Sequence, residues 1–520
     1  MQQVISSMAF RLILGAVLVA VAQVAAVRPA AAAADSPTVT PATGGNGVPL
    51  INGGVVDPDA IGYDTAEFFI SGNAHSYTTA APLTPDGKWN AISADPTTSA
   101  YATRVIVYTP KEKFRGTVYV EWLNVSGLID ASPDWAQSHT EVARQRAAFV
   151  LVSAQAAGVN QLKNGGIAPG DPVRYASLNH PGDHYSYDIF SQAGQAVWDG
   201  SLLGGLVPRR VIATGQSQSA GRLATYIDAV HQLVDVYDGY IVHSRGAGSS
   251  ALAAGVPTPV PTLLRDDLVP VIAFQAEADV ANSGLLSRQP ETPDGNYRLW
   301  EVPGTGHFDH YGLSIGPVDL GDGQGEIDNL ATMQDPPTEP SPPGLPIPGL
   351  FLCAEGINTG PMHWVFNAAV RWMDRWVRSR GRRAPPIAPR LEAITAPGVS
   401  PAEFAVDEHG NALGGIRTPY VDAPIATLTG VGNGAAPGAP PFSSFCSAFG
   451  VTIPFTDEKL AELYPTHRSY VNAFGGATRD AVRSKFLLKR DARLLRRAAG
   501  MSDIGSPSGA FLDVSANTLG

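Results

Sequence analysis

The sequence is poor in cysteine, in net positive charge and in long apolar runs. Only two cysteines occur among 520 residues, and they are too few to predict a metal site. Acidic residues outnumber basic ones by 47 to 36, which gives a formal net charge of −11. Because proteins that bind nucleic acid need a basic surface, this balance argues against nucleic acid as a partner. No motif in the sequence implies a metal ion or another cofactor.

A single long apolar run lies near the beginning of the chain. Residues 12–27 read LILGAVLVAVAQVAAV, follow Arg11 and precede the small residues of RPAAAAADS. The run is short for a bilayer span, and small residues after an apolar core are typical of a signal-cleavage site. We therefore expect residues 1–34 to be a signal peptide and the mature protein to be secreted or periplasmic, with no stable membrane span.

The two cysteines are Cys353 and Cys446. In an exported protein an isolated pair of cysteines is most simply a disulfide. This one would close a loop of 93 residues (446 − 353). The alternative is a pair of unrelated buried thiols.

The pattern of apolar residues predicts an α/β fold. Short Val- and Tyr-rich runs between residues 66 and 125 are typical of strands, and helical and strand-like segments alternate from about residue 135. Further strands are expected at 269–276 and 297–304. This order favours a mostly parallel central sheet with helices on both faces.

The rest of the chain divides by composition. Residues 35–50 are rich in Pro, Gly and Thr and predict a flexible leading segment before a catalytic domain at 51–385. Within that domain, the Pro/Gly-dense residues 311–360 predict an ordered excursion or lid without a helix. Residues 386–520 are expected to pack on the catalytic domain as an integral C-terminal segment, with one helix through 456–474 and another through 489–500.

The segment GQSQS places Ser217 in a sharp turn between a predicted strand and a predicted amphipathic helix. It is close to the G-x-S-x-G nucleophile elbow, in which the residues two before and two after the nucleophile must be small so that strand and helix can approach. Gly215 and Ser219 satisfy that need. Ser217 is therefore the candidate nucleophile, and Ser219 the small residue that lets the turn close.

A serine hydroxyl needs a base, and in this fold an acid and a histidine follow the nucleophile in that order. Asp279 follows one predicted strand in QAEADV, and His307 follows the next in PGTGHFDHY. Both should lie at the same sheet edge as Ser217. Glu277 remains an alternative acid, and His363 an alternative base.

A serine that attacks a carbonyl carbon also needs N–H groups nearby, because they stabilise the oxyanion that the attack forms. One should be the backbone N–H of Gln218, the residue after the nucleophile. The other should come from the loop after the third strand, where Leu123 and Asn124 are the candidates.

Several segments together resemble a family of secreted α/β-hydrolase-domain proteins whose substrates are mostly unassigned. They are VYVEWLNVSG, ASPDW, TGQSQSAGRL, RLWEVPGTGHFDHY and GNALGGIRTPY. The resemblance implies an α/β-hydrolase fold, with Ser217 as nucleophile, His307 as base and a C-terminal segment that is part of the domain.

These observations predict an exported serine hydrolase that cleaves a small or polymeric carboxylic ester through an acyl-enzyme. Two alternatives stay open from the sequence. The same triad could pass the acyl group to another hydroxyl, as an acyltransferase does, or the protein could be a non-catalytic binding module on a hydrolase scaffold.

Overall fold

The computed structural model describes residues 34–51, 57–340 and 349–506. The predicted signal peptide, apart from Ala34, lies outside these residues. No helix within the described ranges is both long and apolar enough to span a membrane.

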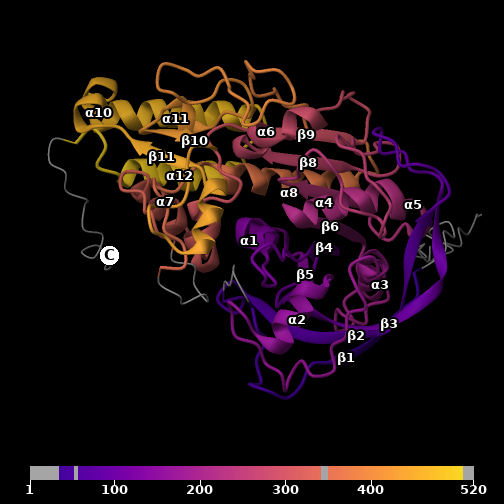
Figure 1. The fold of residues 1–520 in the computed structure, drawn as a ribbon. Helices are drawn as coiled ribbons and strands as arrows, with labels where there is room; N and C mark the ends of the chain where they lie inside the picture. The colour runs from indigo at the N-terminus through magenta and orange to yellow at the C-terminus, as the bar shows by residue number, and fades with distance from the viewer. Residues whose placement is uncertain (1–33, 52–56, 341–348, 507–520) are drawn as a thin grey trace, which may run out of the picture.

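A nine-stranded sheet forms the centre of the molecule, in the order β1-β2-β3-β5-β4-β6-β7-β8-β9 (Figure 1). In this order the strands from β5 to β9, β4 included, run parallel to one another. At the other side of the sheet β1, β2 and β3 pair antiparallel. This confirms the predicted mostly parallel sheet. The strand bounds are β1 (Thr38–Pro41), β2 (Tyr63–Thr79), β3 (Ile92–Pro110), β4 (Thr117–Trp122), β5 (Ala148–Val152), β6 (Arg210–Gln216), β7 (Gly239–His243), β8 (Val271–Ala276) and β9 (Tyr297–Val302).

The central strands are mostly apolar because helices cover both of their faces. Every residue of β4, β5, β7, β8 and β9 is buried. A strand buried on both sides cannot alternate apolar and polar side chains, so AFVLV in β5 is typical of this position. The long strands β2 and β3 instead keep exposed residues and curve along one side of the molecule (Figure 1).

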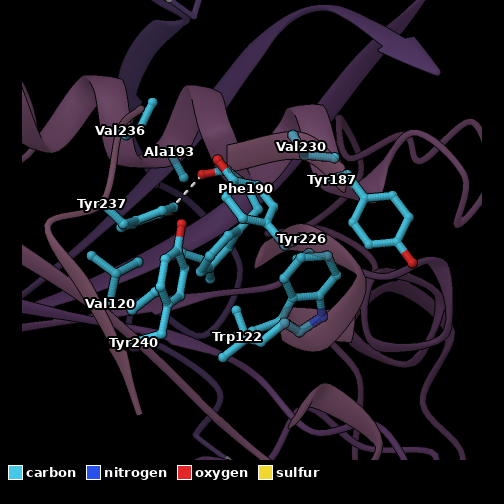
Figure 2. Packing of buried hydrophobic residues seen from close by; sticks show 14 of the residues in the cluster. Val120, Trp122, Tyr187, Phe190, Ala193, Tyr226, Val230, Val236, Tyr237 and Tyr240 are labelled. Atoms are coloured by element: carbon cyan, nitrogen blue, oxygen red, sulfur yellow. Dashed lines mark hydrogen bonds between the residues drawn. The ribbon is translucent and has the colours of Figure 1, made fainter. Parts of the chain in front are cut away.

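Each face of the sheet has its own apolar core. On one face, α3 (Ser186–Trp198) and α4 (Gln218–Thr225) pack over residues such as Val120, Trp122 and Tyr240 (Figure 2). On the other, α1 (Pro133–Gln145) and α8 (Met362–Arg378) cover residues such as Tyr119. The remaining α-helices are α2 (Ala156–Asn164), α5 (His231–Val234), α6 (Glu277–Asn282), α7 (Gln324–Thr332), α9 (Pro419–Asp422), α10 (Asp457–Leu463), α11 (His467–Arg483) and α12 (Lys489–Met501).

A third apolar cluster joins the C-terminal segment to α7 and α8. It includes residues of α9, α11 and α12 and of β10 (Ala426–Thr429), which pairs antiparallel with β11 (Val451–Pro454). Trp364 of α8 stacks on Tyr420 with ring centroids 4.8 Å apart. The side chains of both residues are buried in this contact.

The structure corrects three predictions about local structure. Residues 38–41, in the segment expected to be flexible, form β1, because the β-branched run Thr38-Val39-Thr40 pairs with β2. The segment 311–360 contains the helix α7. Its prolines cluster only after residue 335, so residues 324–332 can form a helix.

The third correction concerns the single helix expected through 456–474. It is two helices, α10 and α11, with the break at Pro465. Thr466 begins the second one, since its side chain accepts the N–H of Ser469 and the Ser469 hydroxyl accepts the N–H of Thr466.

Candidate active site

Ser217 lies in a strained turn between β6 and α4. Its φ and ψ are 62° and −119°, a conformation that a residue with a side chain rarely adopts. The Ser217 N–H donates to the carbonyl of His243 at the end of β7, at 2.9 Å. A Cβ added to Gly215 would lie 3.2 Å from the Cβ of Ser219, so the residues before and after the turn must be small, as predicted. The turn presents the Ser217 hydroxyl beyond the carboxyl end of the sheet.

The structure brings Ser217, His307 and Asp279 together. His307 Nε2 lies 2.7 Å from Ser217 Oγ, and His307 Nδ1 lies 2.5 Å from Asp279 Oδ1. The other carboxylate oxygen, Asp279 Oδ2, accepts the N–H of Ala276 at 2.7 Å, which fixes the carboxylate at the end of β8. When Nδ1 donates its proton to Asp279, Nε2 is left free to accept the proton of the serine hydroxyl.

The pKa of His307 reflects opposing effects. Burial lowers the pKa of this imidazole, but the negative charge of Asp279 and the hydrogen bond to it raise the pKa above its ordinary value of 6.5. The carboxylate therefore stabilises the protonated imidazole, which is the form that a general base reaches when it takes up a proton.

The alternative acid, Glu277, binds other groups. Its carboxylate accepts the N–H of Gly304 at 2.7 Å and the N–H of Gly430 at 2.9 Å. Burial raises the pKa of Glu277, and the hydrogen bonds from Gly430, Gly304 and Thr429 partly offset that rise. Glu277 thus ties the loop that carries His307 to the C-terminal segment.

The alternative base, His363, is also held elsewhere. Its Nδ1 lies 2.7 Å from the carbonyl of Gln137, and its Nε2 lies 3.1 Å from Asn367 Nδ2. The ring stacks on Tyr311 with centroids 3.9 Å apart. His363 is a buried packing residue at the start of α8.

The two candidates for the second oxyanion donor are not supported. The N–H of Leu123 donates to the carbonyl of Val152 at 3.2 Å, and the N–H of Asn124 donates to Ala131 at 2.9 Å. The loop after β4 therefore closes on its own backbone and on β5. Gln218 is the first residue of α4, where an N–H has no acceptor within the helix, so this N–H stays a candidate oxyanion donor.

Sequence reasoning missed the role of Gln216, which precedes the nucleophile. Its side-chain Nε2 donates to the main-chain carbonyl of His307 at 3.1 Å. The main-chain carbonyl of Gln216 accepts a hydrogen bond from Asn124 Nδ2 at 2.9 Å. Gln216 thus links the loop of the histidine to the loop after β4. Its position inside GQSQS was the only available signal.

A buried polar pair beneath the turn was also missed. His243 Nδ1 lies 2.6 Å from Asp134 Oδ1, and Thr214 of β6 donates its hydroxyl to the same carboxylate. The N–H of Asp134 in turn donates to Glu121, whose pKa is raised by burial and by the charge of Asp134. The main-chain carbonyl of His243 accepts the N–H of Ser217. The buried pair of His243 and Asp134 therefore helps to fix the position of the nucleophile.

Two cavities meet at Ser217 and His307. One, of about 290 Å³, has a mostly apolar lining that includes five phenylalanines. The other, of about 490 Å³, is lined mostly by serine and glycine residues and by two amide side chains, together with Arg245 and Asp279. In the described ranges no group of three or more histidine, cysteine or carboxylate side chains could hold a metal ion.

The disulfide predicted between Cys353 and Cys446 is confirmed, with an S–S distance of 2.02 Å. Both cysteines are buried in a small apolar cluster next to the first cavity.

Comparison with known proteins gives one extensive match. A family model described as "Alpha/beta hydrolase domain" matches residues 28–497. No curated protein matches the chain.

Several solved structures are similar over part of the chain. Methylesterase BT1017 is 14% identical with a TM-score of 0.25, and the alignment covers 47% of this chain and 45% of that one. Acetyl xylan esterase 1 from a Thermoanaerobacterium species is 11% identical, with coverages of 41% and 53% and a TM-score of 0.22. The hyperthermophilic esterase of the archaeon Pyrobaculum calidifontis is 14% identical, with coverages of 38% and 70% and a TM-score of 0.23. The chain spans about half the length of the first two.

Proposed function

The chain belongs to the alpha/beta hydrolase domain family, and from this premise we propose that it is an exported serine hydrolase that cleaves carboxylic esters. The observation that carries the proposal is the continuous contact from Ser217 Oγ through the His307 ring to Asp279. Members of one fold family can differ in chemistry, so the proposal rests on this site and not on the fold.

The geometry supports a two-step reaction. In the first step Ser217 Oγ attacks the ester carbonyl carbon while His307 Nε2 takes the hydroxyl proton, and the carbonyl π bond becomes an oxyanion. When this intermediate collapses, the bond to the alcohol oxygen breaks, and His307 returns the proton to the departing alcohol. Ser217 is left as an acyl ester.

The second step repeats the chemistry with water. His307 Nε2 takes a proton from a water molecule, whose oxygen attacks the acyl carbon, and the proton then passes to Ser217 Oγ as the free acid departs. Asp279 keeps the imidazole in the required tautomer and stabilises its protonated form. The N–H of Gln218 is the donor assigned to the oxyanion in both steps.

The test is hydrolysis of a short activated ester such as 4-nitrophenyl acetate by the wild type and two variants. Ser217→Ala should lower kcat by about 10⁴-fold or more, because the acyl-enzyme cannot form. Ser219→Ala is the matched control, since the Ser219 hydroxyl donates to the carbonyl of Leu123 and not to His307. Activity that survives in Ser217→Ala would overturn the proposal.

A further inference from the structure

The two cavities beside Ser217 differ sharply in chemistry. Ser217 and His307 line both of them, so each cavity is within reach of a substituent of an ester bound at Ser217. The apolar cavity has a volume of about 290 Å³, near the lower limit of small-molecule pockets. It therefore fits one substituent of an ester and not a long polymer chain.

The wall of the apolar cavity comes from two segments that are distant in the sequence. Phe351 lies two residues before Cys353, while Phe445 and Phe449 lie on either side of Cys446. The Phe351 ring is 6.3 Å from that of Phe445 and 5.7 Å from that of Phe449, in edge-to-face arrangements. The three rings form one aromatic wall, which we call the phenylalanine wall.

The disulfide joins the two segments of this wall. Main-chain hydrogen bonds accompany it, from Ala436 N–H to the carbonyl of Leu352 at 2.9 Å and from Ala354 N–H to that of Gly434 at 2.8 Å. The wall is also tied to the histidine, because the N–H of Phe308 donates to Ala448 at 3.3 Å. The covalent bond thus fixes the position of the wall relative to the reacting groups.

The second cavity offers hydrogen-bonding groups in place of rings. Its lining includes Gln218, Ser250, Asn282 and Ser283, and glycines such as Gly246 and Gly248 leave its surface open. Such a lining offers hydrogen-bond partners to hydroxyl or amide groups and no phenylalanine ring to an alkyl chain.

We propose that the enzyme selects esters with one apolar substituent, alkyl or aryl, of a size limited by the smaller cavity, and one polar substituent that binds in the larger cavity. The apolar substituent binds against the phenylalanine wall, and the Cys353–Cys446 disulfide is the specificity element that holds that wall in place. This inference rests on the proposed ester hydrolysis.

Two matched series of esters test the substrate class. One series lengthens the acyl chain from two to about ten carbons on a fixed glycol alcohol, and the other lengthens the alcohol on a fixed glycolic acid. In one of the two series kcat/KM should rise about fourfold per methylene until the cavity is full, as expected for burial of apolar surface. The series that rises identifies the apolar substituent as the acyl or the alcohol part. Flat or falling profiles in both series would overturn the inference.

Opposite substitutions at one position of the wall separate specificity from structural damage. Phe351→Ala should move the optimum to longer chains, and Phe351→Trp should move it to shorter ones. Phe404→Ala is the control, because Phe404 is a partly buried phenylalanine in a different cluster and lines neither cavity. Optima that stay fixed in both Phe351 variants would contradict the assignment of the wall.

The disulfide is tested with the Cys353→Ser/Cys446→Ser double variant and with reduced wild type. We expect kcat/KM to fall about tenfold or more for the best long ester and to stay within about twofold for the shortest. An equal loss on both esters would contradict a role in specificity. If the double variant does not fold, the comparison of oxidised and reduced wild type decides the role of the disulfide. If no ester of any length is cleaved, the proposed function fails, whereas cleavage without length dependence refutes only this inference.

Discussion

Glu277 and Asp279 lie two residues apart just after β8, yet they bind different groups of the loop that follows β9. Asp279 Oδ1 contacts His307 Nδ1 at 2.5 Å, whereas Glu277 Oε2 accepts the N–H of Gly304 at 2.7 Å. One turn of α6 therefore carries an acid assigned to the reaction and an acid that holds the surrounding structure. This division can be tested by removing one charge at a time.

Asp279→Asn should lower kcat by about 10⁴-fold, because an amide at this position favours the wrong imidazole tautomer. Glu277→Gln is the matched control and should retain activity within about tenfold. The measurement is steady-state hydrolysis of a short ester by both variants. A larger loss in Glu277→Gln than in Asp279→Asn would reverse the assignment.

Glu277→Gln should instead lower the stability of the fold. A glutamine offers one acceptor oxygen, so the N–H of Gly304 or of Gly430 would lose its partner in a buried site. An unsatisfied buried donor costs about 1–3 kcal/mol of unfolding free energy, measurable by denaturant titration. A variant as stable as the wild type would show that these bonds add little.

The pH profile should report the raised pKa of His307. His307 acts as a base only when Nε2 is unprotonated, and Asp279 raises its pKa above 6.5, so kcat/KM should fall with a midpoint above pH 6.5 as the pH decreases. In Asp279→Asn the residual activity should fall with a midpoint at lower pH, because the charge that raises the pKa is gone. A wild-type midpoint below pH 6.5 is the contrary result.

The strain at Ser217 gives a prediction about stability. Ser217→Gly and Ser217→Ala both remove the hydroxyl, but only glycine adopts a φ of 62° without cost. Ser217→Gly should therefore unfold with a free energy about 1–2 kcal/mol higher than Ser217→Ala in denaturant titrations. Equal values for the two variants would show that the turn stores no strain.

Gln216→Leu tests the link between the nucleophile strand and the histidine loop. Without the Gln216 amide, the carbonyl of His307 loses a donor at 3.1 Å, and the loop should hold the imidazole less firmly. We expect kcat to fall about tenfold with KM nearly unchanged. A change in rate of about tenfold corresponds to about the free energy that one hydrogen bond contributes. An unchanged kcat would mean that other contacts position His307.

Local patterns predicted the sheet and the meeting of the three side chains. The run in β5 and the spacing GQSQS each follow from packing rules that act within a few residues. Asp279 and His307 were found because each follows a strand, and parallel strands end at one edge of the sheet.

The features that the sequence did not reveal depend on distant contacts. Phe351 and Phe449 become neighbours only after the C-terminal segment folds against the loop before α8, so no local pattern marks them as a cavity wall. The choice between Glu277 and Asp279 depends on where Gly304 and Gly430 lie. The sequence also did not reveal that the N–H of Leu123 donates to the carbonyl of Val152 and the N–H of Asn124 to that of Ala131, so that both groups already have partners.

The most direct test of the central claim is covalent labelling of the folded protein by a fluorophosphonate, read by intact mass and peptide mapping. We expect one adduct per chain, on Ser217, with labelling abolished in Ser217→Ala, strongly slowed in His307→Ala and unchanged in Ser219→Ala. An adduct on Ser219, or a folded protein that takes up no label, would show that Ser217 is not the nucleophile.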